Sequence, residues 1–584
     1  MTTDLAIAAE QPPDAAPRQT GPDIPSWFDD ESPRGRRTRR LRLLARPLAV
    51  VAGLALAAGL WFGGRPAQAI TVLGIVALAL GVVCGVAGLR RLLSTGHPVV
   101  GVARAIVEEA VGTRLSVLLV MLVVVALPTL PLVLDPSERL AYRLQFFLDW
   151  SLSGASVLLS LITIALSCTS VCGDIESHRI HMALSKPLRR WEYLLGKWLG
   201  VVLLDLLLVG LVGIGVYAFA ESLRRAPAAD NVDRRAVEEQ VLTARASARP
   251  VHPRQQEFDT AVEAAIAQIR KDDPALFDKD AAGARKRIFN QHVFLWHTVS
   301  PDVVSSYLFT GLEAAKLRTP VVQLRLQAFA DNSETSAAEI RFALWLNERP
   351  YPVKQGKHEE YVLAAGPVHT LELPATAIAD DGTLRVTIAN RNMLMPGDPA
   401  PTSIGFNPGD GLELLYRVGS FEGNMFRALL LMWAKLAMLA AVALAAAAWL
   451  GLPVAMLASL MVFAAAVASG FLADAIDIYT GVDIADPTLT SMLRLRGTLL
   501  MERVAKAEWW EAIKTVGSWA ADAFLVLIPS FGDYDSITQV ATGRLVSAAS
   551  TAAGVCELGV AYPLLLLAIG WWLIERRDLV SSTT

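Results

Sequence analysis

Apolar runs long enough to cross a lipid bilayer recur along this chain of 584 residues. A helix needs about 20 apolar residues to span the hydrocarbon core, and 53% of the chain is hydrophobic. Inside lipid, helices satisfy their own backbone hydrogen bonds. We therefore predict a polytopic α-helical membrane protein with about eight spans. These are residues 47–63, 70–89, 115–134, 150–171, 198–220, 427–449, 454–473 and 557–574.

Basic residues indicate which side of the membrane each end faces. Residues 1–46 form a predicted disordered tail that ends in arginines from Arg34 to Arg46, with no acidic residue among them. Such clusters mark the cytoplasmic side and favour contact with anionic lipids over nucleic acid. Residues 47–96 then form a predicted transmembrane hairpin. Counting the spans puts both termini inside. We expect an integral protein of the cytoplasmic membrane of a bacterium.

The polar stretch 221–425 is predicted to be an extracytoplasmic α+β insert. Helical periodicity runs through 231–295, whereas apolar and polar residues alternate between 304 and 420, as in Val322-Gln-Leu-Arg-Leu326. Short alternating strands separated by turn residues predict an antiparallel β-sandwich. No cysteine falls between 221 and 425, so this domain contains no disulfide. The remaining residues, 426–584, form a second membrane part, in which 474–556 is predicted to be extracytoplasmic or re-entrant, with 519–531 as the ambiguous segment.

Residues 97–220 form the first membrane part. Residues 98–114 have one apolar face and an Arg104–Glu108 pair on another. This pattern predicts an amphipathic helix, which either lies on the inner leaflet or extends the next span. Asp205 lies within the span 198–220. It is either a functional intramembrane carboxylate or a group near the inner interface, stabilised by Lys197 or Arg190.

A charged loop between two spans carries the most specific motif of the chain. It reads Asp174-Ile-Glu176, then Ala183-Leu-Ser-Lys-Pro-Leu-Arg-Arg-Trp-Glu-Tyr-Leu-Leu-Gly-Lys197, and the chain ends with Ile574-Glu-Arg-Arg-Asp-Leu579 after an apolar run. Both stretches resemble type-two ATP-binding-cassette (ABC) transporter permeases, which are usually exporters. One departure is His178-Arg-Ile180, where the family often has a small Gly-Thr-type pair.

The resemblance implies a permease subunit that works as a homodimer or pseudo-dimer with a separate cytoplasmic ABC ATPase. The loop 172–197 would take up the push from that ATPase. The residues implied in the loop are Asp174, Glu176, Lys186, Pro187, Arg189, Arg190, Gly196 and Lys197. Those of the C-terminal cytoplasmic motif are Glu575, Arg576, Arg577 and Asp578.

The sequence contains no Gly-x-x-x-x-Gly-Lys-Ser/Thr stretch, so the chain itself has no P-loop for ATP. We expect ATP and magnesium on the partner ATPase, and no cofactor, metal site or catalytic residue in this chain. A second hypothesis is a non-transporting membrane anchor that displays the sandwich to glycans or proteins. A third, an intramembrane enzyme, would use Asp205 or Asp522.

Overall fold

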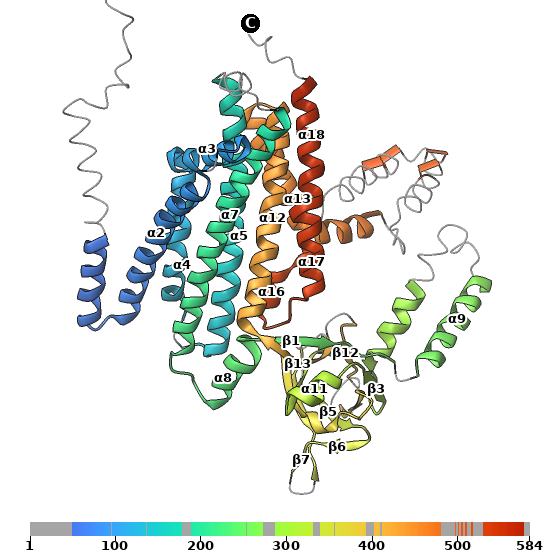
Figure 1. The fold of residues 1–584 in the computed structure, drawn as a ribbon. Helices are drawn as coiled ribbons and strands as arrows, with labels where there is room; N and C mark the ends of the chain where they lie inside the picture. Colours follow the sequence, from blue (N-terminus) through green and yellow to red (C-terminus); the bar gives the residue numbers. More distant parts are fainter. Residues whose placement is uncertain are drawn as a thin grey trace, which may run out of the picture. The chain divides into compact units, whose positions relative to one another are not determined.

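The computed structural model of the chain is shown in Figure 1. It describes residues 50–94, 96–135, 137–177, 189–252, 254–272, 287–330, 339–354, 357–392, 402–408, 411–480 and 530–576, together with isolated helical residues between 497 and 517. The predictions for the tail 1–46 and for most of 519–531 lie outside the described residues. The chain divides into two compact units, Met1–Val76 and Ala77–Thr584.

Within the described residues, seven helices are long and apolar enough to cross a membrane. A shorter apolar helix, Val50–Phe62, precedes them. The seven are α2 (Pro66–Leu92), α4 (Arg114–Val133), α5 (Leu140–Glu176), α7 (Arg190–Arg224), α12 (Phe421–Trp449), α13 (Leu452–Thr480) and the continuous run of α17 (Ala548–Cys556), η4 (Glu557–Ala561) and α18 (Tyr562–Arg576). The predicted polytopic helical protein is thereby confirmed, although the last helix begins at Ala548 and not at 557.

Helix α12 forms the centre of the helical bundle. It packs against α5, α7, α13 and α18, and Figure 1 shows it between α7 and α18. Half of its buried residues are alanines, which allow close helix packing where lipid supplies no hydrophobic drive between helices. We call the end of the bundle where α5 ends and α7 begins the loop end. The opposite end, where β13 leads into α12, is the sandwich end.

Between α7 and α12 the chain forms two antiparallel sheets. The first has the order β1 (Thr243–Ala248), β13 (Leu412–Ser420), β4 (Val321–Ala330), β12 (Ile404–Phe406) and β2 (Thr298–Val299), with β10 (Val368–Pro374) also paired to β4. The second has the order β3 (Val304–Phe309), β11 (Leu384–Asn390), β5 (Glu339–Leu346) and β6 (Arg349–Tyr351), with β9 (Tyr361–Ala364) paired to β5. The strands β7 (Val353–Lys354) and β8 (Lys357–His358) pair separately.

The two sheets share one apolar core. Leu324 and Leu414 of the first sheet belong to the same buried cluster as Phe342, Leu344 and Val386 of the second. The alternation along β4 places every second residue in this core, because side chains of a strand point to opposite faces in turn. The predicted antiparallel sandwich is therefore present.

The segment that leads into the sandwich is not helical throughout, as 231–295 was predicted to be. Helices α8 (Asn231–Ala236), η1 (Val237–Val241) and α9 (Gln255–Asp272) are interrupted by β1. Strand β1 adds to the first sheet beside β13. The sequence of β1, Thr-Ala-Arg-Ala-Ser-Ala, carries no strong strand signal. Its extended conformation therefore depends on pairing with β13.

Residues 530–547 connect the helical bundle to the sandwich. Near their start the Phe531 N–H donates to Ala466 O of α13 (3.0 Å), and Lys435 Nζ of α12 donates to Phe531 O (3.2 Å). The chain continues through η3 (Gly532–Tyr534) and α16 (Ser536–Ala541), and Leu545 N donates to Arg245 O of β1 (2.8 Å). This stretch therefore runs from the middle of two membrane helices to the edge of the first sheet.

Candidate functional site

The loop end holds the residues that the loop motif singles out. Helix α5 ends at Glu176 and α7 begins at Arg190. Lys186 and Pro187 lie outside the described residues. Arg189 precedes α7, and its backbone N–H donates to the Glu192 carboxylate (2.9 Å), which stabilises the first turn of the helix. Glu176 and Arg189 are both exposed, so their side chains are accessible on the surface beside the loop.

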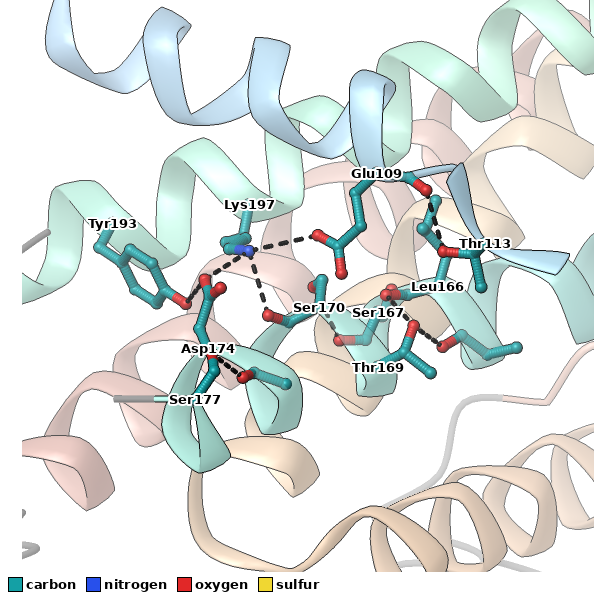
Figure 2. Close-up of polar contacts among 12 residues, drawn as sticks. Glu109, Thr113, Leu166, Ser167, Thr169, Ser170, Asp174, Ser177, Tyr193 and Lys197 are labelled. Atoms are coloured by element: carbon teal, nitrogen blue, oxygen red, sulfur yellow. Dashed lines mark hydrogen bonds and ion pairs between the residues drawn. The ribbon is translucent and has the colours of Figure 1, made fainter. Parts of the chain in front are cut away.

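A buried lysine at the loop end joins three helices. Lys197 of α7 is 3% exposed, and its ammonium lies 2.8 Å from the Asp174 carboxylate of α5 and 3.7 Å from that of Glu109 in α3 (Pro98–Gly112). It also donates to Ser170 O (3.1 Å), so the ammonium group is neutralised by two carboxylates and donates to a backbone carbonyl. The Tyr193 hydroxyl donates to Asp174 (2.8 Å). Figure 2 shows this arrangement, which we call the Lys197 cluster.

Two glycines of α7 allow α3 to approach closely. A Cβ atom at Gly196 would lie 2.8 Å from Val99 O, and one at Gly200 would lie 2.7 Å from Ala103 O. Glycines four residues apart form a flat helix surface on which a second helix can rest. The opposing face of α3 is buried through Val99, Ala103, Ile106, Val107 and Ala110. Gly196 was implied by the family resemblance, whereas Gly200 was not.

Helix α3 is a separate helix and not an extension of α4. Thr113 between them has an extended backbone, with φ −80° and ψ 120°. The apolar face of α3 rests on α7, while the Arg104–Glu108 pair (3.1 Å) is exposed. The amphipathic pattern is therefore explained by packing on a neighbouring helix.

The two stretches that resembled the permease family meet at the loop end. Arg190 Nη1 of α7 donates to Ile574 O (2.7 Å) in the last turn of α18. An arginine at this position satisfies a carbonyl that the helix itself leaves unpaired. Arg576 lies over the Trp572 ring at 4.1 Å, and Glu575 is exposed. Arg577 and Asp578 lie outside the described residues.

Asp205 is 1% exposed and lies in α7, away from the Lys197 cluster. Its contact is with the Thr163 hydroxyl of α5 (2.9 Å). Lys197 and Arg190, which the sequence offered as its stabilising partners, bind the groups described above. A second intramembrane charge, Lys435 of α12, was not singled out from the sequence, because a lone lysine within an apolar run gives no indication of its partner.

Among the described residues, no group of three or more His, Cys, Asp or Glu side chains is placed to hold a metal ion. The site is therefore built from an ion cluster, a close helix contact and a helix-end cap. Such an arrangement can hold three helices as one rigid body.

Comparison with known proteins finds a family that is similar to part of the chain. Residues 102–244 match the model of a family described as ABC-2 family transporter protein. The match begins in α3 and extends through α4, α5 and α7 to β1, so it contains the entire Lys197 cluster. It confirms the resemblance to type-two ABC permeases. No curated protein and no solved structure matches the chain.

Proposed function

We propose that the chain is the permease subunit of an ABC exporter and is driven by a separate cytoplasmic ATPase that carries ATP and magnesium. The Lys197 cluster is the observation that carries this proposal, because it lies at the base of the loop on which such an ATPase would push. In this proposal the loop end faces the cytoplasm of a bacterium, both chain termini lie inside, and the sandwich lies outside.

The Lys197 cluster supports a mechanical role for the loop. A push on residues 177–189 acts first on the last turn of α5 and the first turn of α7. Since Lys197 binds Asp174 and Glu109 together, α3, α5 and α7 respond as a unit. The Arg190–Ile574 bond extends this unit to α18. The chain thus transmits force while the partner performs the chemistry, which fits a subunit that is not itself an enzyme.

Two copies of the chain, or this chain and a related one, would enclose the transport path beside two ATPase subunits. The apolar outer faces of α2 and α4 would contact membrane lipids, because large apolar side chains are exposed there, such as Val83 in α2 and Leu118 and Met121 in α4.

The proposal predicts that the loop end, and not the sandwich end, controls ATP turnover. Glu176→Lys reverses an exposed charge at the end of α5, so it should leave the fold intact but weaken docking of the ATPase. We expect permease-dependent ATP turnover of the purified pair to fall about tenfold, which corresponds to about 1.4 kcal/mol. Glu239→Lys, an exposed reversal at the sandwich end, is the matched control. Equal turnover for both variants would count against the coupling role.

The anchor hypothesis has one observation in its favour. The sandwich has a groove of about 640 Å³ whose lining includes Lys316, Asn347, Tyr351 and Asp380. A ligand-display protein would bind glycan or protein there without any ATPase. Co-purification decides between the two: an ABC ATPase that stays with the full chain and hydrolyses ATP supports the exporter. A chain that retains a glycan or protein at the groove, and no ATPase, supports the anchor.

A further inference from the structure

Asp205 is a carboxyl group deep inside the helical bundle. It lies fifteen residues after the start of α7 at Arg190, which places it about 22 Å along the helix. One carboxyl oxygen, Oδ1, lies 2.9 Å from Thr163 Oγ1 of α5. The other, Oδ2, is buried and has no hydrogen-bond partner. An ionised carboxylate in such a place would keep one oxygen without any hydrogen-bond donor, which strongly disfavours the charged form in the helix interior.

The hydrogen bonds around Thr163 can be balanced by counting protons. Thr163 Oγ1 lies 2.8 Å from Leu159 O and 2.9 Å from Asp205 Oδ1. A threonine hydroxyl has one proton, so it can donate in only one of these contacts. Leu159 O has no proton to give. If the hydroxyl donates to Asp205 Oδ1, the other carboxylate oxygen, Oδ2, still has no donor. If the hydroxyl donates to Leu159 O, the contact with Asp205 requires a proton on the carboxyl group. In this second arrangement both contacts are satisfied, and Oδ2 is left as a neutral carbonyl oxygen.

Helices α2, α3, α4, α5, α12 and α18 contact α7, and their charged groups are the candidates to pair with Asp205. Within α7, Lys197 belongs to the Lys197 cluster with Glu109 of α3 and Asp174 of α5. Lys435 of α12 binds Phe531 O, and Arg576 of α18 lies over Trp572. Helix α4 has no charged residue after Arg114. The other charges of these elements are Arg90 and Arg91 in α2, Arg104 and Glu108 in α3, Arg143, Asp149 and Glu176 in α5, Arg190, Glu192, Glu221 and Arg224 in α7, Glu422 and Arg427 in α12, and Glu575 in α18. Among the described residues, none of these charged groups forms an ion pair with Asp205 that could stabilise its ionised form.

We infer that Asp205 is a proton-binding site, which holds a proton while water is excluded from the contact between α5 and α7 and releases it when water reaches the carboxyl group. The proton passes from the carboxyl group to a water molecule, leaving a carboxylate and a hydronium ion, and returns when that water leaves. Proton binding and helix packing are then linked, so each favours the other. The inference concerns this chain alone and holds whether or not it transports a substrate.

Infrared spectroscopy of the purified full chain in detergent tests for the proton directly. At neutral pH a buried protonated carboxyl group gives a C=O stretching band that exposed carboxylates lack. We expect one such band to disappear in Asp205→Asn and to persist in Asp135→Asn, a matched change at an exposed turn residue whose carboxylate accepts from Ser137. A spectrum in which Asp205→Asn removes no protonated-carboxyl band would overturn the inference. It would indicate a carboxylate hydrated by buried water.

The pH dependence of unfolding gives a second readout. A group that holds its proton in the folded chain but loses it on unfolding makes the folded state less stable as pH rises. This loss of stability occurs at pH values at which the folded chain holds the proton and the unfolded chain does not. There the folded-to-unfolded ratio of the natural chain, relative to that of Asp205→Asn, should fall by about tenfold per pH unit. Asn has nearly the same shape and no titratable proton, so it removes the slope without a cavity. A constant difference between the two proteins from acidic to alkaline pH would contradict the proposal.

Discussion

At the scale of single residues, Asp233 ties the segment that follows α7 to the start of α5. It is 1% exposed, and its carboxylate accepts hydrogen bonds from the backbone N–H groups of Leu140 (2.9 Å), Ala141 (3.0 Å) and Ala229 (3.1 Å). Helix N-termini leave such donors unpaired and favour negative charge. Burial alone would raise the pKa of Asp233. The three N–H donors and nearby Arg139 outweigh it and lower the pKa below its usual 3.8.

This geometry predicts that Asp233→Asn destabilises the chain at neutral pH by about 1–2 kcal/mol, because an amide offers one acceptor oxygen where the carboxylate offers two. A folded-state pKa below the unfolded value gives stability that is present above the unfolded pKa and is lost as pH falls through the folded one. The thermal unfolding curves of the two proteins should therefore separate at neutral pH and converge as the pH falls through the lowered folded-state pKa of Asp233. Glu239→Gln, an exposed neighbour, should show no such gap.

At the scale of elements, the contact of α3 with α7 depends on Gly196 and Gly200. Gly200→Leu places a side chain against the backbone of Ala103, and we expect α3 to be displaced at a cost of about 1–3 kcal/mol. Gly210→Leu on the same helix is the control, since a Cβ there meets nothing within 4 Å. Thermal unfolding and permease-dependent ATP turnover should both decline for Gly200→Leu alone. Equal losses for the two variants would mean that the effect comes from the helix itself.

The contact of α3 with α7 separates the features that the sequence could predict from those that it could not. Long apolar runs predicted the spans, and alternating apolar and polar residues predicted the sandwich. Both could be predicted because the pattern of buried residues in a helix or strand is visible within its own sequence. The loop motif drew attention to Lys197 and Asp174. Glu109, in contrast, looks like any acidic residue of an amphipathic helix until α3 is placed on α7. Strand β1 was missed for the same reason, since its partner β13 lies about 170 residues further along the chain, from Thr243 to Leu412.

At the scale of the whole molecule, a charged joint links the sandwich to the membrane helices. Glu413 of β13 is 2% exposed and binds Arg325 of β4 and Arg544 of the stretch 530–547. Ser247 of β1 donates to its other oxygen (2.6 Å). Arg245 of β1 lies beside them, and burial, together with the positive charges of Arg544 and Arg325, lowers its pKa to about 10, so it stays charged at neutral pH.

The joint continues into α12 without a flexible connection. Strand β13 ends at Ser420, which caps the first turn of α12. Asn424 of that turn donates to Arg544 O (2.6 Å) and accepts from the Val546 N–H (2.7 Å). A displacement of α12 is therefore passed to the first sheet through three connections, namely the chain itself, Asn424 and Glu413. We therefore expect the sandwich to move together with the helices. A passive spacer would instead be attached through a flexible connection.

The joint predicts a local response to the loss of one charge. Glu413→Gln keeps the shape of the side chain but removes the carboxylate that binds Arg325 and Arg544, a change that costs about 3–5 kcal/mol in comparable buried pairs. Hydrogen exchange should then become faster in 243–248 and 542–546, while β3, β5 and β11, which the core of the sandwich holds, keep their protection. Glu372→Gln, an exposed carboxylate in β10, is the control. Faster exchange throughout the sandwich would show that Glu413 supports the fold of the domain and not its attachment to α12.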